Sequence, residues 1–170
     1  LKIEYQFNQR ADVLPLVARI KDMFDLDADP MKIEQDLKQD KKLNAFIESY
    51  GGLRLPGCWD GFELAVRAIV GQKISVKAAQ TVVRRLVQRH GQPQNILPEL
   101  ALTHFFPTPE YIMQADLTNI GLTQAKIHSI KALAHALHTK ALVLDGTADY
   151  ETTCQKLLSI KGIGPWTVQY

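Results

Sequence analysis

Residues 157–170 read LLSIKGIGPWTVQY, and this stretch decides the fold that we expect. An apolar helix end leads into Gly162-Ile-Gly164, and Pro165 then begins a second helix. Glycine permits a positive φ and a close approach of the backbone, and proline fits the first turn of a helix. We therefore predict a hairpin between two helices that directs several backbone N–H groups at one point. Such a point can bind a phosphate without reading a base.

A Gly-x-Gly pair alone is weak evidence, because ordinary turns contain it as well. The whole frame, L-x-x-I-x-G-I-G-P-W-T, resembles the hairpin of the helix-hairpin-helix DNA glycosylases of base excision repair. Residues 54–79 read RLPGCWDGFELAVRAIVGQKISVKAA. This second stretch is similar to the helix and turn that precede the base-flipping wedge of the bacterial 3-methyladenine DNA glycosylase II family. The resemblance extends over about residues 1–170 and includes the spacing between the two stretches.

The composition is typical of a soluble globular protein, with 46% hydrophobic and 22% charged residues in 170. No apolar run is as long as a membrane span, and the N-terminus has no signal-peptide pattern. Cys58 and Cys154 are isolated and lack the spacing of metal ligands. We therefore expect no membrane partner and a reduced intracellular compartment, which would be the nucleoid-associated cytoplasm in a bacterium.

The net charge is only +2, but it is distributed unevenly. Residues 1–50 contain 8 Lys/Arg and 10 Asp/Glu, whereas residues 51–170 contain 12 and 8. An ordinary solvated helical surface is enough to explain this uneven charge. The positive balance of residues 51–170 is consistent with a nucleic-acid partner but does not by itself indicate one.

The first seven residues alternate between apolar and polar, as a half-buried strand does. A lone strand is not stable, so it either pairs with a partner or ends a domain that lies upstream. The resemblance implies the second case, because relatives of this type carry a small N-terminal sheet domain. We predict that residues 1–8 are the remnant strand of that sheet domain. Residues 9–170 would form a helical glycosylase domain that is incomplete at its C-terminus.

The remaining sequence has helical periodicity, so we predict a mainly α fold with a stray N-terminal β-strand. Capping residues that begin helices include Asp29, Ser75, Thr123 and Asp149. A proline-bearing loop is expected at residues 91–107. Helices are expected at residues 11–24, 30–50 with a break near Asp40, 59–70, 75–90, 108–115, 123–138 and from Asp149 into the hairpin.

The resemblance assigns DNA contacts to the hairpin and a structural cation beneath it. The hairpin residues expected at DNA are Lys161, Gly162, Ile163, Gly164, Trp166 and Thr167. The cation, monovalent or similar, would be held by the backbone carbonyls of Leu158, Ile160 and Gly162, and hard cations accept such oxygens. No cofactor is required. The alternative is a bare turn between two helices.

Trp166 occupies the position at which backbone-cleaving relatives carry a lysine that forms a Schiff base with the sugar. The resemblance therefore implies a monofunctional enzyme without lyase activity. It also implies that Trp166 and Tyr170 line a pocket for the flipped base. Alkylated purines are positively charged, and a cation over an aromatic ring gains about 0.5–2 kcal/mol. The alternative is that both aromatic residues anchor the core.

Gln72-Lys73-Ile74-Ser75 corresponds to the turn that inserts a wedge into the duplex as the damaged base leaves it. The wedge position is Lys73, where relatives usually have glutamine or an apolar residue. A lysine could fill the gap with its aliphatic stem and reach a phosphate with its ammonium. The alternative is a solvated loop charge.

The catalytic aspartate of this family follows the second helix of the hairpin and stabilises the oxocarbenium-like sugar. No residue of this chain matches it, because Asp145 and Asp149 precede the hairpin and suit a turn and a helix cap. We therefore expect this polypeptide alone to be inactive. The arginines Arg84, Arg85 and Arg89, and the histidines His128, His135 and His138, are expected to be ordinary surface residues or, for the histidines, satisfied core residues.

Our leading hypothesis is a glycosylase that flips alkylated purines such as 3-methyladenine out of double-stranded DNA and hydrolyses the N-glycosidic bond. The main alternative is a non-catalytic DNA-binding module with the same hairpin. A mismatch-thymine or adenine glycosylase is a weaker alternative, because those branches commonly carry an iron–sulfur cluster and two scattered cysteines cannot ligate one. A structural interaction domain without a DNA role is the most distant alternative.

Overall fold

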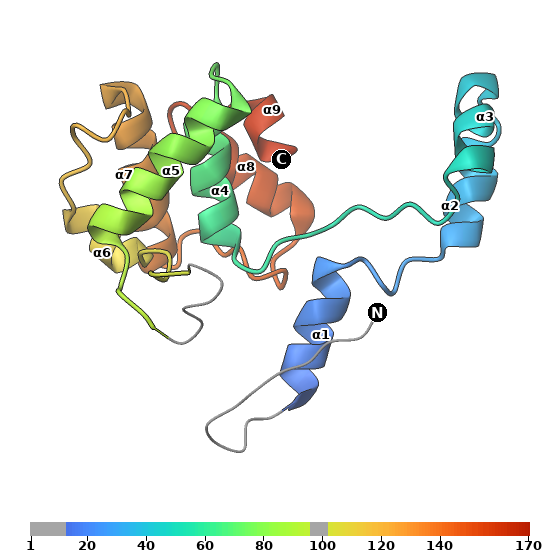
Figure 1. Cartoon of the computed structure of the whole chain (residues 1–170), viewed down its shortest axis with the longest axis horizontal. Coiled ribbons are helices and arrows are strands. Elements are labelled where there is room, and N and C mark those ends of the chain that lie inside the picture. The colour runs from blue at the N-terminus through green and yellow to red at the C-terminus, as the bar shows by residue number, and fades with distance from the viewer. Residues whose placement is uncertain (1–12, 96–101) are drawn as a thin grey trace. The chain divides into compact units, whose positions relative to one another are not determined.

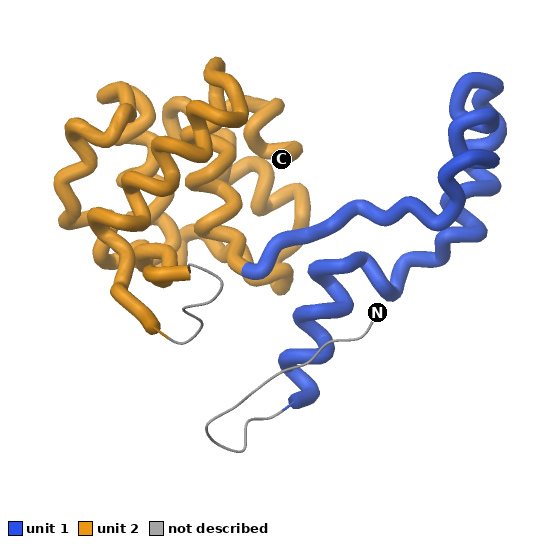
Figure 2. The backbone as a smooth tube through the Cα atoms, viewed as in Figure 1, with its two compact units in different colours: residues 1–59 blue, residues 60–170 orange. Residues whose placement is uncertain are grey.

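The computed structural model describes residues 13–95 and 102–170. The chain divides into two compact units, residues 1–59 and residues 60–170 (Figure 2). The described residues are predominantly helical, which confirms the predicted mainly α fold. The predicted strand at residues 1–8 lies outside the described residues, so the strand and the domain boundary after it stay predictions.

The described part of the first unit contains three helices, and carboxylates cap two of them (Figure 1). Asp29 accepts hydrogen bonds from the N–H groups of Met31 and Lys32, and Asp40 does the same for Lys42 and Leu43. The predicted break near Asp40 is therefore the N-cap of a new helix. The three helices are α1 (Val13–Met23), α2 (Pro30–Leu37) and α3 (Lys41–Ser49).

The segment after α3 is bonded back to α1 within the same unit. The Arg19 guanidinium lies 4.3 Å from the centroid of the Trp59 ring and donates to the Trp59 carbonyl. The N–H of Gly57 donates to the Met23 carbonyl at 2.8 Å. Among the described residues of this unit only Ile47 is buried, so the unit has little core of its own there.

The second unit contains six helices in its described residues, and each corresponds to a predicted one. Polar residues cap them as expected, among them Ser75, Thr123 and Asp149. One boundary differs: the helix expected from Trp59 begins at Gly61, because Asp60 is extended and its carboxylate accepts the N–H of Glu63. The helices are α4 (Gly61–Gly71), α5 (Val76–His90), α6 (Pro109–Gln114), α7 (Gln124–His138), α8 (Tyr150–Ser159) and α9 (Pro165–Val168).

The core of the second unit is built around α4 and α7. The inward face predicted for α4 is confirmed, since Phe62, Val66, Ile69 and Val70 are all buried. Burying one such side chain contributes about 1.5–3 kcal/mol. The core continues from α7 to the hairpin through two buried isoleucines, Ile160 and Ile163.

The described ends of the predicted loop 91–107 pair with each other. Pro93 and His104 form an antiparallel bridge, and the N–H of Phe105 donates to the Gln92 carbonyl at 2.9 Å. The sequence did not predict this pairing, because the segment is too short and too rich in proline to show strand periodicity.

Candidate nucleic-acid interface

The predicted hairpin joins α8 and α9 in the second unit. Ile160 ends α8, and Pro165 occupies the first turn of α9. The N–H of Ile163 donates to the Ile160 carbonyl at 3.0 Å, which closes the turn. Both isoleucine side chains are buried, so the core holds the base of the hairpin in place.

The two glycines of the hairpin have different roles. Gly162 has a φ of +93°, and a Cβ there would come well inside 3.0 Å of the Ser129 Oγ. Gly164 has an ordinary φ of −107°, and a Cβ there would meet nothing within 4 Å. The conformational freedom of glycine is therefore required at Gly162, whereas Gly164 keeps the surface of the hairpin open.

Three N–H groups of the hairpin, those of Gly162, Gly164 and Trp166, have no hydrogen-bond partner among the described residues. Ile163 differs, because its N–H is used within the turn and its side chain is buried. Ile163 therefore packs the hairpin and has no free donor for a phosphate. The three free donors are available to an anion at the surface.

The turn between α4 and α5 contains the predicted wedge position. Lys73 is exposed and has a φ of +56°, in the left-handed region. This conformation costs a residue with a Cβ about 1–2 kcal/mol, so its surroundings must hold it. Ser75 then caps α5 by accepting the N–H of Ala78 at 3.2 Å.

Gln72 bonds this turn to the hairpin. Its Nε2 donates to the Gly162 carbonyl and to the Thr167 Oγ1, both at 2.9 Å. The wedge turn and the hairpin therefore lie side by side, as Figure 1 shows for α9 and the turn between α4 and α5. Gln72 was predicted to lie at DNA as part of the wedge turn, and its amide joins that turn to the hairpin.

Lys126 of α7 is a residue that the sequence did not predict to matter. Its Nζ donates to the carbonyls of Val70 and Gln72, both at 2.8 Å, at the C-terminal end of α4. Such carbonyls lack partners within the helix itself. Burial lowers the pKa of Lys126. One feature of the sequence could have indicated a role for Lys126. It lies in the first turn of a helix, where the helix dipole disfavours a positive charge.

A groove of about 790 Å³ lies between the wedge turn and the hairpin. Trp166 is 85% exposed and Tyr170 is 70% exposed, so neither anchors the core. The charged residues of the lining are Arg67 and Lys73, and no carboxylate is among the lining residues. The predicted site residues that line it are Gln72, Lys73, Gly162, Gly164, Trp166, Thr167 and Tyr170.

The groove lining does not include the other predicted hairpin residues, among which Lys161 has an exposed side chain. The carbonyls predicted to hold a cation also accept hydrogen bonds from the protein, Ile160 from Ile163 and Gly162 from Gln72. Each carbonyl keeps a second lone pair, so these oxygens, with that of Leu158, fit a hard cation. The cation stays a prediction. Within the described residues, no cluster of His, Cys, Asp and Glu side chains could hold a metal ion.

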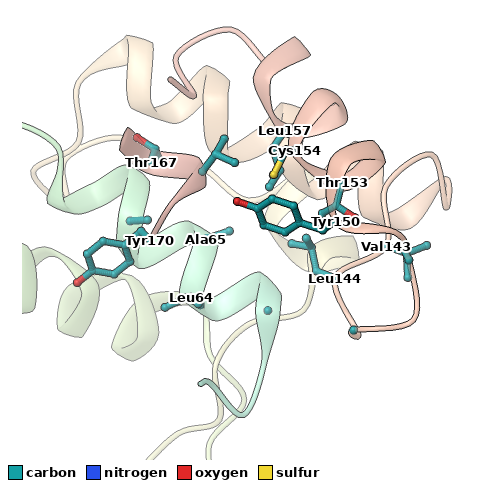
Figure 3. Close-up of a pocket in the computed structure, with 15 residues that line it drawn as sticks. Leu64, Ala65, Val143, Leu144, Tyr150, Thr153, Cys154, Leu157, Thr167 and Tyr170 are labelled. Carbon is teal, nitrogen blue, oxygen red and sulfur yellow. The ribbon is translucent and has the colours of Figure 1, made fainter. Parts of the chain in front are cut away.

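A second, apolar pocket of about 330 Å³ borders the groove and shares Ala68, Thr167 and Tyr170 with it. Figure 3 shows its walls: Leu64 and Ala65 come from α4, and Tyr150, Cys154 and Leu157 come from α8. Its lining contains no charged side chain. Tyr170 therefore stands between a groove that contains two charged residues and a pocket that contains none.

The remaining polar residues behave as predicted. Asp145 accepts the N–H and the hydroxyl of Thr147, and Asp149 caps α8, so both are turn and cap residues. Hydrogen bonds from Thr147 and Thr152 lower the pKa values of these two carboxyls. The arginines and histidines expected at the surface are exposed, namely Arg84, Arg85, Arg89, His128, His135 and His138.

Two families match the sequence along its length. Residues 1–60 match the AlkA N-terminal domain, and residues 66–163 match the HhH-GPD superfamily of base excision DNA repair proteins. The chain is 38% identical over 158 residues to a probable bifunctional transcriptional activator/DNA repair enzyme AlkA of Mycobacterium tuberculosis, covering 93% of this chain and 32% of that protein. It is 34% identical over 157 residues to DNA-3-methyladenine glycosylase 2 of Escherichia coli, covering 91% of this chain and 52% of that protein. The chain thus spans about a third to a half of these relatives.

Solved structures of glycosylases have the same fold. A 3-methyladenine DNA-glycosylase from Archaeoglobus fulgidus aligns with a TM-score of 0.74 and 27% identity, covering 96% of this chain and 56% of that one. A 3-methyladenine DNA glycosylase of Schizosaccharomyces pombe, solved with abasic DNA, aligns with a TM-score of 0.63 and 25% identity, covering 81% of this chain and 66% of that one. No helix in the described ranges is long and apolar enough to cross a membrane.

Proposed function

The chain belongs to the HhH-GPD superfamily of base excision DNA repair proteins. We propose that it contains the DNA-binding site of an alkylation-repair glycosylase. Its reaction would be hydrolysis of the N-glycosidic bond of alkylated purines, such as 3-methyladenine, in double-stranded DNA. The observation that carries this proposal is the groove, since free N–H donors, a left-handed turn and two exposed aromatic rings border the same space. A DNA substrate would place the protein in the nucleoid-associated cytoplasm of a bacterium.

The hairpin would hold a backbone phosphate beside the damaged nucleotide. The free N–H groups of Gly162, Gly164 and Trp166 can donate to phosphate oxygens without reading sequence. The helix that follows has only four residues, so the N–H groups rather than a helix dipole would provide most of the attraction. Lys73 and Arg67 give the groove the charge that an anionic strand requires, although Arg67 pairs with Glu63 at 2.6 Å.

In base flipping, the wedge turn would fill the gap left in the duplex, and the aromatic rings would bind the extruded base. Removing a base from the stack costs a few kcal/mol, and a side chain that enters the gap offsets part of this cost. Lys73 is exposed at the tip of the turn and would fill the gap with its aliphatic stem. Trp166 and Tyr170 would receive the base, and their rings favour the positive charge of an alkylated purine. Trp166 has no amine, so the enzyme would release the base without cutting the strand.

The lining of the groove provides no carboxylate to stabilise the sugar cation. We therefore expect the 170-residue chain to bind damaged duplex without releasing base. Release would require a carboxylate from another polypeptide segment. Base release from methylated DNA by this chain alone, at the rate of the Escherichia coli relative, would contradict this expectation.

The experiment that tests the function is fluorescence anisotropy with two duplexes, one intact and one with a tetrahydrofuran abasic analogue. The wild type is expected to prefer the abasic duplex by about tenfold, which corresponds to about 1.4 kcal/mol. Trp166→Ala should remove most of this preference, because the ring borders the space that a flipped nucleotide would enter.

Tyr111→Ala is the matched control, because Tyr111 is also exposed but does not line the groove. Binding without any preference for the damaged duplex would favour a non-catalytic DNA-binding module. If the wild type binds neither duplex, the proposed function is wrong.

A further inference from the structure

Helix α7 touches both turns that the proposed function places at DNA. Lys126 bonds the wedge turn, and Ser129, three positions later on the same face, bonds the hairpin. We propose that Lys126 and Ser129 are positioning residues that fix the wedge turn and the hairpin at a set separation, so that phosphate binding drives wedge insertion. This inference rests on the proposed function and assigns a role to two residues that do not line the groove.

The two bonds act at equivalent points of the two turns. Lys126 Nζ donates at 2.8 Å to the Gln72 carbonyl, and the peptide unit of that carbonyl leads directly into Lys73, with its φ of +56°. Ser129 Oγ donates at 2.7 Å to the Lys161 carbonyl, whose peptide unit leads into Gly162, with its φ of +93°. In both turns α7 therefore holds the peptide plane that precedes the left-handed residue. Because a peptide unit is rigid and planar, holding its carbonyl restricts the backbone rotations that are open to the residue after it.

The environment makes each bond a stable one. Ser129 is 2% exposed, so water competes little for its hydroxyl. Lys126 is half-buried and also donates to the carbonyl of Val70, which is itself buried. Hydrogen bonds from a charged donor are stronger than those between neutral groups.

Gln72 closes the connection between the two turns. Its side chain donates to the Gly162 carbonyl, while its own carbonyl accepts from Lys126. The wedge turn, the hairpin and α7 are thus linked pairwise by hydrogen bonds. A displacement of the hairpin by a bound phosphate would be carried to Lys73 rather than absorbed by the turn.

The test is wedge insertion, measured with 2-aminopurine placed opposite a tetrahydrofuran site in a duplex, alongside affinity for an undamaged duplex. Binding of the wild type should unstack the fluorophore and raise its emission. Lys126→Met keeps the stem but loses both bonds. It should reduce the rise in emission at saturation by about threefold or more and change affinity for undamaged duplex by less than about twofold, or 0.4 kcal/mol.

Two variants show whether the effect belongs to the bonds of Lys126. Lys126→Arg keeps a charged donor and should restore most of the emission. Lys131→Met removes the same charge from the same helix, but Lys131 lies about 140° around the axis and should match the wild type. A Lys126→Met protein with wild-type emission, or an equal loss in Lys131→Met, would overturn the proposal.

Ser129→Ala tests the other half of the link and does not depend on the folding of the Lys126 variant. Loosening the hairpin should weaken binding to intact and abasic duplexes alike, by about three- to tenfold, or about 0.7–1.4 kcal/mol. Circular dichroism melting shows that each variant is folded at the assay temperature. Unchanged affinity of a folded Ser129→Ala protein would overturn the role of Ser129. If the wild type binds no DNA, the proposed function fails, and this inference fails with it.

Discussion

Replacing Gly162 by alanine should destabilise the second unit strongly, although the substitution adds only one methyl group. The alanine has two costs in this structure. Its backbone must adopt a φ of +93°, and its Cβ comes well inside 3.0 Å of the Ser129 Oγ. Ser129 would have to turn its hydroxyl away and release the Lys161 carbonyl. The substitution therefore combines backbone strain with the loss of a nearly buried hydrogen bond.

The magnitude follows from these two terms. A left-handed conformation costs alanine about 1–2 kcal/mol. Leaving the Lys161 carbonyl without its donor adds about 1–3 kcal/mol. The sum is about 2–5 kcal/mol, which lowers the melting temperature of a domain of this size by about 8–20 °C. Thermal melting of the chain, followed by circular dichroism, measures it.

Gly164→Ala is the matched control within the same motif. Gly164 has an ordinary φ, and its Cβ would project into open space, so the alanine should be neutral or stabilise by about 0.4–1 kcal/mol through the unfolded state. Its effect should instead be on DNA, because a methyl group would stand beside free N–H donors of the groove. Removing the Ser129 hydroxyl as well should make Gly162→Ala less costly than it is alone. A Gly162→Ala protein that melts within about 2 °C of wild type would refute this reasoning.

Two further predictions concern the same unit. Gln72→Glu places a carboxylate against the Gly162 carbonyl, to which the amide of Gln72 donates at 2.9 Å. The substitution should lower the melting temperature by about 4–12 °C and should also lower DNA affinity. Thermal melting and anisotropy measure the two effects, and a neutral result would show that this bond contributes nothing. His90 is nearly buried, and burial lowers its pKa from 6.5, so the unfolded state binds more protons below that pH and stability should fall as the pH drops through about 6.5. The acidic groups Glu110 and Asp116 also have lowered pKa values, but their contribution is lost only at lower pH, near and below 4.5. His90→Phe should flatten the dependence of the melting temperature between about pH 7 and pH 5, and an unchanged slope would assign it to other groups.

The sequence predicted the helices of the second unit well, because their signals are local. Asp149, Thr123 and Ser75 cap the expected helices, and the apolar spacing of α4 matches its buried face. These features depend on residues three or four positions apart. The one shifted helix start reflects Asp60, an N-cap that lies next to the aromatic residue from which the periodicity was counted.

The interactions that join the two turns could not be predicted in the same way. Gln72 contacts residues 90 and 95 positions away, and Lys126 contacts carbonyls more than fifty positions away. Three of these four bonds go to backbone carbonyls, which every residue possesses, so no pattern of side chains marks them. The sequence also treated the two hairpin glycines alike, whereas the structure distinguishes them by the positive φ of Gly162 and by the position of Ser129.

The placement of these bonds relates the stability of the second unit to its proposed action on DNA. A wedge can use the energy of phosphate binding to open the stack only if the turn that carries it does not yield. Here Gln72, Lys126 and Ser129 hold the two turns from the protein side, while Gly164, Trp166 and Lys73 face the groove and make no such bonds among the described residues. Substitutions in the first set should therefore change stability together with either DNA affinity or wedge insertion. Substitutions in the second set should weaken DNA binding without destabilising the fold, because none of these residues joins the two turns.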